Sequence, residues 1–398
     1  MNEINHIFNE FRNKRNGLEM SRNEMKEYLN RFSGNILLYG AGSSGIAFLY
    51  DLKKIGVTPR FFVDSNVSKI GKKCEGIEII STEEVVARVT GDFLVIICIN
   101  TDGKRYCKSF DEALRVGGHH GVYDRLHSVG CKNVIDYTFF RRCFTIFTDE
   151  HYNAPSCSDV ELMLLHEEEI AHVYEYLDDE LSRETFRKII EFRLLDDSIE
   201  VPTLPQSTQY FEEGLYHPRN DAAFIDCGAY NGISAKTFFE IQHDQFEAYY
   251  GIEPDTDNYN KLKEYFGNLE KPVRDKCNLV NKAVWGRSGE HNLYALDGPG
   301  SFIADDIGKS KVSSTTIDEL LHGKKATFIK MNIEGSEKQA LRGAENTIRT
   351  HKPELAIAGY HRTDDLWRIP MMIKKFRDDY ILNLRSYMNH MSFVYYAR

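Results

Sequence analysis

The sequence predicts an α/β protein with two parallel-sheet domains, and three observations support this. Short apolar runs of strand length alternate with helical stretches in two separate parts of the chain, which is typical of parallel sheets. A glycine-rich turn follows the first strand of each series, in ILLYGAGSSG (36–45) and FIDCGAYNG (224–232). The chain has 398 residues, more than one typical core of about 100 to 200 residues. We therefore expect two Rossmann-like domains.

Composition and charge exclude several classes of protein. The formal net charge is -10, so a surface built to neutralise nucleic-acid phosphates is not expected. The N-terminus lacks the apolar stretch of a secretory signal, and the longest apolar runs, such as FLVIICI (93–99), are far shorter than the roughly 20 residues of a membrane helix. The eight cysteines form no CxxC pair, which suits reduced thiols. These features predict a cytoplasmic protein.

The first half divides into three segments. Residues 1–32 are polar and helical, with a loose apolar face. Residues 33–148 carry ILLYG, FFVD (61–64) and FLVIICI, and form the first Rossmann-like, nucleotide-binding-type domain. Residues 149–205 are acidic and helical, with Ser182 as a candidate N-cap, and are expected to be a connector that packs on the second domain.

Residues 206–398 contain the second series. Five parallel-type strands are expected in AAFIDCG (222–228), AYYGIEPD (248–255), NLVNKAVWG (278–286), ATFIKMNIEG (326–335) and PELAIAGYH (353–361). YILNLRSY (380–387) and SFVYYAR (392–398) follow with only MNHM between them, which predicts an antiparallel hairpin at the sheet edge. This is the strand inventory of a class I methyltransferase sheet.

The first glycine turn suits a diphosphate. Gly40, Gly42 and Gly45 follow the G-x-G-x-x-G spacing with no acid in the turn, and Asp64 at the next strand end could bind a ribose. A structural turn that only packs helix on strand is the alternative.

The second turn contains a carboxylate. Asp226 lies two residues before Gly228, where it would repel a diphosphate and attract the α-ammonium of a methionine moiety, directly or through water. Glu253 ends the next strand and could accept both ribose hydroxyls, although a solvated acid is the alternative. The pattern favours S-adenosylmethionine over a dinucleotide.

Taken together, FIDCGAYNG, YYGIEPD, NKAVWG and FIKMNIEGSEKQALRGAENTI resemble the FkbM family of S-adenosylmethionine-dependent O-methyltransferases over residues 206–398. The resemblance implies methylation of hydroxyl groups on sugars or polyketide-type products. It also implies a cofactor site made of Asp226, Gly228, Ala229 and Gly232 at the methionine end, Glu253 at the ribose and Ala283 at the adenine wall. Tyr230, in the same turn, is also expected to bind the cofactor. The sequence departs from the family signature K-x-D-x-E-G at Asn332. Separately, ILLYGAGSSG with VDSNVSKIGKKCEGIEII (63–80) resembles the Rossmann-like domain that precedes sugar-modifying enzymes of surface-glycan pathways.

Methyl transfer to a hydroxyl requires a base near the ends of the fourth and fifth strands. The end of the fourth strand offers Lys330, Asn332, Glu334 and Glu337, and the end of the fifth offers His361. His361 has a side-chain type suited to accepting a proton at neutral pH, and Glu334 is the other candidate base. The alternative for His361 is an ordinary polar histidine in a loop, and the alternative for Glu334 is an acid that only stabilises a helix N-terminus. The amide of Asn332 cannot act as a base, but it can orient a substrate.

Two further patterns are not interpreted as sites. His119, His120, Asp124 and His127 in GGHHGVYDRLH are expected in a loop, so no metal site is predicted. Tyr50 and Lys54 have the spacing of a short-chain dehydrogenase pair, but they lie on the helix directly after the glycine turn, where they cannot face a nicotinamide.

The sequence therefore predicts a methyltransferase that uses S-adenosylmethionine. Its expected acceptor is a hydroxyl of a sugar or nucleotide-linked sugar in surface-glycan biosynthesis, and the first domain could hold the nucleotide. The alternatives are an NAD-dependent sugar-nucleotide oxidoreductase or epimerase, and a non-catalytic partner in a glycan assembly complex. A homo-oligomer is left open.

Overall fold

The computed structural model describes residues 3–99, 114, 120–136, 160–195, 199–294, 300–305, 308, 310–388 and 392–398. They form two compact units. The first holds the described residues up to 136 together with those of Ser156–Glu167 and Ile189–Glu200. The second holds Glu168–Lys188 and Val201–Arg398. The division runs through the predicted connector.

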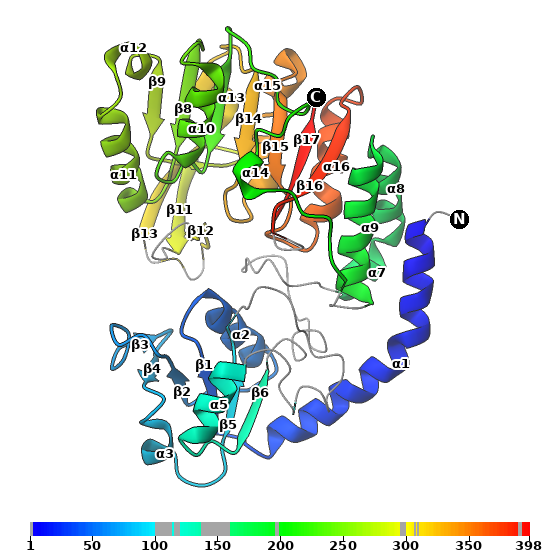
Figure 1. Ribbon diagram of the computed structural model, residues 1–398, viewed down its shortest axis with the longest axis vertical. Helices are drawn as coiled ribbons and strands as arrows, with labels where there is room; N and C mark the ends of the chain where they lie inside the picture. Colours follow the sequence, from blue (N-terminus) through cyan, green and yellow to red (C-terminus); the bar gives the residue numbers. More distant parts are fainter. Residues whose placement is uncertain are drawn as a thin grey trace. The chain divides into compact units, whose positions relative to one another are not determined.

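The first unit is built on a six-stranded sheet in the order β3-β4-β2-β1-β5-β6. Its elements are α1 (Glu3–Asn30), β1 (Ile36–Tyr39), α2 (Ser43–Lys54), β2 (Phe61–Val63), β3 (Lys73–Cys74), β4 (Ile77–Ile80), α3 (Val85–Arg88), β5 (Leu94–Ile97), α5 (His120–Ser128), β6 (Asn133–Asp136) and α7 (Val160–Leu165). All neighbouring strands are parallel except the short β3, which pairs antiparallel with β4. The two apolar faces of the sheet lie in separate core clusters. The parallel α/β fold expected for this part of the chain is therefore present (Figure 1).

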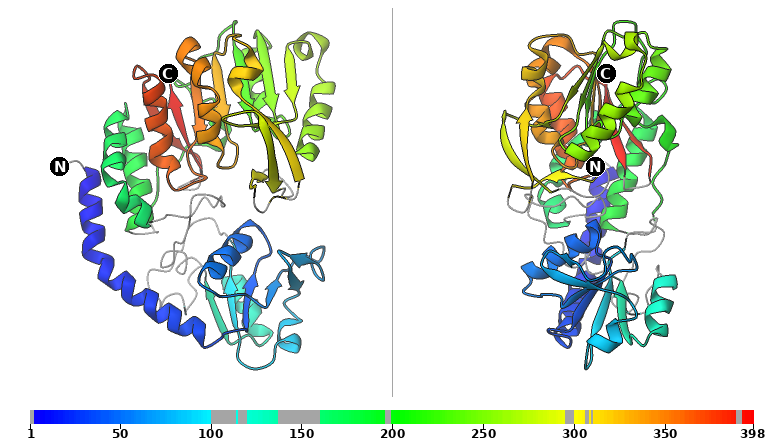
Figure 2. Two further views of the ribbon diagram at one scale, coloured as in Figure 1. Left: turned by 180° about the vertical axis from the view of Figure 1, so that it is seen from behind. Right: turned by 90° about the vertical axis from the view of Figure 1, so that its left-hand side faces the viewer.

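The second unit carries a seven-stranded sheet in the order β16-β17-β15-β14-β7-β8-β9. Its helices are α8 (Glu167–Tyr176), α10 (Ile233–Gln242), α11 (Thr256–Gly267), α12 (Lys271–Arg274), α13 (Ile317–Leu321), α14 (Glu337–Arg342), α15 (Glu345–His351) and α16 (Asp365–Phe376), with a 3-10 turn at Gln206–Thr208. Helix α9 (Glu180–Leu194) is divided between the two units after Lys188. The strands of this sheet are β7 (Ala223–Cys227), β8 (Ala248–Ile252), β9 (Cys277–Val280), β14 (Phe328–Met331), β15 (Glu354–Ala358), β16 (Leu382–Ser386) and β17 (Phe393–Ala397). Helices α10 and α11 cover one face, and α14 to α16 cover the other (Figure 2).

Strands β7, β8, β9, β14 and β15 are parallel. Strand β17 is antiparallel to β15, and β16 is antiparallel to β17. The predicted hairpin is confirmed. A second, four-stranded sheet in the order β10-β13-β11-β12 was not predicted. It consists of β10 (Ala283–Val284), β11 (Gly289–Tyr294), β12 (Phe302–Ile303) and β13 (Ser310–Thr315).

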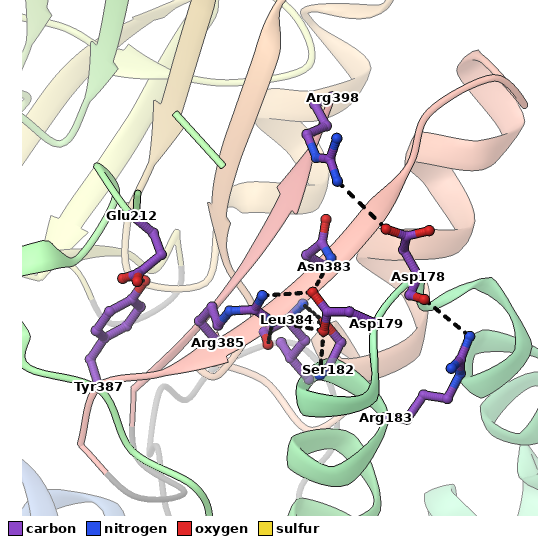
Figure 3. Close-up of polar contacts among 10 residues, drawn as sticks. All are labelled: Asp178, Asp179, Ser182, Arg183, Glu212, Asn383, Leu384, Arg385, Tyr387 and Arg398. Carbon is purple, nitrogen blue, oxygen red and sulfur yellow. Dashed lines mark hydrogen bonds and ion pairs between the residues drawn. The ribbon is translucent and has the colours of Figure 1, made fainter. Parts of the chain in front are cut away.

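The outer strand β16 is covered by the segment that precedes the second series. Asp179 forms an ion pair with Arg385 at 2.6 Å and accepts a hydrogen bond from the Asn383 amide (Figure 3). The Ser182 hydroxyl accepts the backbone N–H of Leu384. Asp179 also accepts the backbone N–H of Ser182, so it caps α9 in the place expected for Ser182. The bond from Leu384 occupies a backbone group that an uncovered edge strand would expose.

Three remaining expectations concern the cysteines, the histidine-rich segment and membrane-spanning helices. The five described cysteines, Cys74, Cys98, Cys131, Cys227 and Cys277, are free thiols. His119 lies outside the described residues, and His120, Asp124 and His127 lie on helix α5 rather than in the expected loop. Within the described part of the chain, no helix is long and apolar enough to cross a membrane.

Candidate active site

A pocket lies at the carboxyl ends of the strands in the second unit. Six of the residues singled out from the sequence line it, and these are Gly228, Tyr230, Glu253, Ala283, Asn332 and Glu334. They come from the ends of β7, β8 and β14 and from the start of the small sheet. The chain order reverses between β7 and β14, and ligands of open α/β sheets bind at such reversal points.

Glycines shape the turn after β7 because side chains would not fit there. Gly228 has φ 80°, and a Cβ on it would lie 2.1 Å from the backbone oxygen of Asn332. Gly232 has φ 91°, and its Cβ would lie 2.6 Å from the Tyr265 ring. Ala229 is buried. Ala229 and Gly232 are not among the lining residues, so they shape the turn, while Gly228 borders the pocket itself.

Glu253 connects the turn to the end of β8. Its Oε2 accepts the backbone N–H of Tyr230 at 3.0 Å, and its Oε1 accepts that of Asp255 at 3.1 Å. Burial raises the pKa of Glu253 to about 7, against the opposing effect of these two N–H groups. Each carboxylate oxygen retains a further lone pair, so Glu253 can still accept hydroxyl groups of a ligand in the pocket.

Asp226 and Lys330 form a buried ion pair behind the pocket. The Lys330 ammonium lies 3.0 Å from Asp226 Oδ1 and also donates to the backbone oxygen of Gly228 at 2.8 Å. Asp226 Oδ2 accepts the hydroxyls of Ser234 and Tyr249. Both charged side chains are at most 3% exposed.

This placement corrects two of the sequence predictions. Asp226 does not line the pocket, and the charge on Lys330 balances its own, so a direct contact with a methionine ammonium does not fit. Lys330 does not line the pocket, because its side chain is bound to Asp226 and to the turn. The pair instead fixes the glycine turn against the end of β14.

The end of β14 supplies the polar side chains opposite Glu253. Asn332 Oδ1 accepts the hydroxyl of Tyr360 at 3.1 Å. Glu334 has φ 54°, an uncommon conformation for a residue other than glycine, and its carboxylate lines the pocket with 23% of the side chain exposed. Its Oε1 lies 3.5 Å from His361 Nε2.

His361 lies behind Glu334. Its side chain is 1% exposed, and its Nδ1 lies 2.9 Å from Oε1 of the fully buried Glu337. Burial acts to lower the pKa of His361, but the carboxylates of Glu337 and Glu334 outweigh it and hold the pKa well above the usual value. The prediction that His361 takes the acceptor proton does not fit, because the ring is buried and does not line the pocket.

Sequence reasoning missed one wall of the pocket. Leu293, Phe302 and Ile303 come from the small sheet, and Ser301 beside them donates its hydroxyl to Asp255 Oδ2 at 3.1 Å. Their segment carries no motif. Lys282 and Val284, by contrast, flank Ala283 in NKAVWG and could have been found from it.

The first unit repeats part of this arrangement at its own turn. Gly40 has φ 111°, and a Cβ on Gly45 would lie 1.9 Å from the Gly40 oxygen. Asp64 Oδ2 accepts the backbone N–H of Ala41 at 2.9 Å, as Glu253 does from its turn. The Lys69 ammonium lies 3.0 Å from Ala41 O and 3.5 Å from Asp64.

The tyrosine of the dehydrogenase-like pair has a hydrogen-bond partner outside that pair. Tyr50 lies on α2, and its hydroxyl donates to Glu75 at 2.8 Å.

The strand order of the second unit, with its pocket at the reversal point, defines a class I methyltransferase fold. Residues 226–395 match the model of the methyltransferase FkbM domain, so the chain carries an FkbM methyltransferase domain and is a methyltransferase. The family resemblance predicted from the sequence is confirmed for this part of the chain.

One solved structure supports this fold along most of its length. The crystal structure of a methyltransferase FkbM from Methylobacillus flagellatus KT is 22% identical, with a TM-score of 0.64, and the match covers 94% of this chain and 93% of that one. A putative rRNA methylase from Clostridium thermocellum (7% identity, TM-score 0.31) and an rRNA methylase from Streptococcus thermophilus (11%, 0.29) each match 46% of this chain and 88% of their own. No curated protein sequence matches the chain.

Proposed function

We propose that the protein transfers a methyl group from S-adenosylmethionine to a hydroxyl of a sugar or nucleotide-linked sugar. The observation that carries the proposal is the pairing of Glu253 and Glu334 within one pocket. Glu253 would accept ribose hydroxyls, and Glu334 is a partly exposed carboxylate on the β14 side of the same pocket. A cofactor-binding acid and a candidate base thus border a common space.

S-adenosylmethionine would supply a methyl group activated by a sulfonium cation. The glycine turn at Gly228 and Tyr230 would hold its methionine end, and Ala283, Phe302 and Ile303 offer an apolar wall for adenine. Glu334 would accept the hydroxyl proton of the acceptor as the oxygen attacks. Asn332, held by Tyr360, would orient the acceptor.

Cofactor binding can be tested by calorimetry with S-adenosylmethionine and S-adenosylhomocysteine. Glu253→Ala should weaken binding at least about tenfold, since it removes the acceptor of two ribose hydroxyls. Asp64→Ala is the matched control, because Asp64 has the corresponding place in the first unit, and it should leave this affinity unchanged. Equal affinities in wild type and Glu253→Ala would contradict the cofactor assignment.

Turnover can be tested with radiolabelled cofactor and a panel of sugars and nucleotide sugars. Glu334→Gln should keep cofactor affinity and lower kcat by about 10²- to 10⁴-fold, the usual effect of removing a general base. A chain that binds the cofactor but releases no S-adenosylhomocysteine with any acceptor would support the non-catalytic alternative.

We also propose that the first unit binds the nucleotide part of the acceptor. In support, its turn carries the free N–H groups of a helix N-terminus, and Lys69 brings a positive charge beside Asp64. Calorimetry with nucleoside diphosphates tests this, with Lys69→Met expected to weaken binding. Retained binding in that variant would refute the assignment.

A further inference from the structure

Three acid and imidazole side chains meet in the interior of the second unit, next to the pocket but outside its lining. They are Glu337 at the start of α14, His361 after β15, and Asp365 at the start of α16, and one ligand atom of each lies within 4.8 Å of the others. All three residues are at most 2% exposed. Helices α14 and α16 pack against each other, so the cluster is closed by secondary structure rather than by loops alone.

These side chains are incompletely bonded. Within the described part of the chain, neither ring nitrogen of His361 has a partner with hydrogen-bond geometry, and the same holds for Glu337 Oε2 and Asp365 Oδ1. Three of these atoms have only a charged neighbour: Nδ1 lies 2.9 Å from Glu337, Nε2 lies 3.5 Å from Glu334, and Asp365 Oδ1 lies 3.3 Å from Lys338. Buried polar atoms in folded proteins are nearly always hydrogen-bonded, so four such atoms in one cluster require an explanation. The other oxygens are satisfied, because Glu337 Oε1 accepts the backbone N–H of Ile333 and Asp365 Oδ2 accepts that of Arg362.

The contact between His361 and Glu337 has the geometry of two ligands of one ion. Nδ1 and Oε1 are 2.9 Å apart, yet they are not aligned as a hydrogen bond. Neighbouring ligands at the usual zinc distances of about 2.1 Å lie about 3.0 to 3.4 Å apart, and each is directed at the metal rather than at the other. The Nδ1–Oε1 distance is close to that of two ligands of one ion, and the two atoms, like such ligands, do not point at each other.

We propose that Glu337, His361 and Asp365 bind a divalent transition-metal ion such as Zn²⁺ or Mn²⁺. Two carboxylates and an imidazole are ligands that these ions accept, and the two negative charges compensate the charge of the ion. His361 coordinates through Nδ1. Its Nε2 then carries the hydrogen and faces Glu334, which is the usual arrangement of a ligating histidine whose second nitrogen faces a carboxylate.

The neighbouring cation is compatible with this site. Lys338 Nζ lies 3.3 Å from Asp365 Oδ1, but it also forms a closer ion pair with Asp364. Asp364 can keep the ammonium when Asp365 Oδ1 turns to the ion. The site would hold the ends of α14 and α16 together and fix the ring that contacts Glu334.

Metal content tests the proposal independently of methyl transfer. The full chain is stripped with a chelator, incubated with Zn²⁺ or Mn²⁺ in turn, desalted and measured by inductively coupled plasma mass spectrometry. One equivalent per chain is expected in wild type, with at least about a tenfold loss of occupancy in His361→Gln. His217→Gln is the matched control, because His217 forms a similar Nδ1–Glu354 contact of 2.6 Å on the surface, and it should retain the full equivalent. Less than a tenth of an equivalent in wild type, or an equivalent retained by His361→Gln, would overturn the proposal.

A second measurement does not depend on the variant folding. Crystals of the wild-type chain soaked in Zn²⁺ should give an anomalous difference peak between Glu337 and His361. A fully occupied ion elsewhere, with no peak between these two residues, would refute the site even if the stoichiometry were one.

Discussion

Replacing Lys330 with methionine should destabilise the second unit strongly. The change leaves Asp226 fully buried with no opposite charge, while the Ser234 and Tyr249 hydroxyls still donate to it. Removing one partner of a buried pair typically costs about 3 to 5 kcal/mol. We expect a loss in that range for Lys330→Met. Asp226→Asn in the same chain should recover part of it, because the uncompensated charge is then removed.

The assay is urea unfolding followed by tryptophan fluorescence. The chain has two tryptophans, Trp285 and Trp367, and both belong to the second unit, so the signal reports that unit alone. Lys325→Met is the matched control, since Lys325 pairs with Asp221 at 2.6 Å but the two side chains are 47% and 45% exposed. Exposed pairs contribute about 0 to 1 kcal/mol. Similar losses in the two lysine variants would refute the reasoning.

Three further predictions concern the pocket. Ribose hydroxyls favour the ionised form of Glu253, so cofactor affinity measured by calorimetry should rise between pH 6 and 8. Below the pKa of about 7, the rise should be up to about tenfold per pH unit. Glu253→Gln should flatten this pH dependence. For folding the sign is opposite: since its pKa is raised from 4.5, Glu253 stabilises the folded chain at low pH and loses this contribution as pH rises to about 7. Gly228→Ala should lower the free energy of unfolding in the urea assay by about 3 kcal/mol or more. Gly214 is the control, because it has a similar φ of 77° but no atom lies within 4 Å of an added Cβ, and Gly214→Ala should cost only about 1 kcal/mol. Equal losses in the two variants would contradict the steric clash at Gly228. Asn332→Asp should keep kcat/KM within about threefold, because Tyr360 donates to the oxygen that both side chains share, and a loss near a hundredfold would show that the amide group is needed.

Local signals were sufficient for the sheet and for part of the pocket. Each parallel strand is an apolar run, and Gly228, Glu253, Ala283 and Asn332 all directly follow or begin a strand. Since parallel strands bring their carboxyl ends to one sheet edge, these residues are expected to meet whatever the exact strand order. The antiparallel pair at the C-terminus was equally readable, because only a few residues separate its strands.

Interactions that depend on strand register could not be read in the same way. Lys330 and Asp226 are 104 residues apart and become partners because β14 pairs with β7 in a register that sets them opposite each other. In the sequence, nothing indicates that these two charges are paired. Asp226 was therefore interpreted as a cofactor-binding residue and Lys330 as a candidate base. The wall at Phe302 has the same origin, since it reaches the pocket only through the pairing of β11 with β12 and β13.

The ion pair also changes the electrostatic comparison of the two glycine turns. The acid in the second turn was expected to select a cationic cofactor, but Lys330 compensates Asp226 and turns its ammonium away from the pocket. The acids after the second strands, Asp64 and Glu253, accept a turn N–H in the same manner, so they do not distinguish the turns. The remaining difference is Lys69, whose partly exposed ammonium lies at the first turn. A positive charge there favours a phosphate, while the second turn, with its own ammonium neutralised, can accept a sulfonium without repulsion. The cations beside the two turns, rather than the acids, are therefore expected to determine which ligand each turn binds.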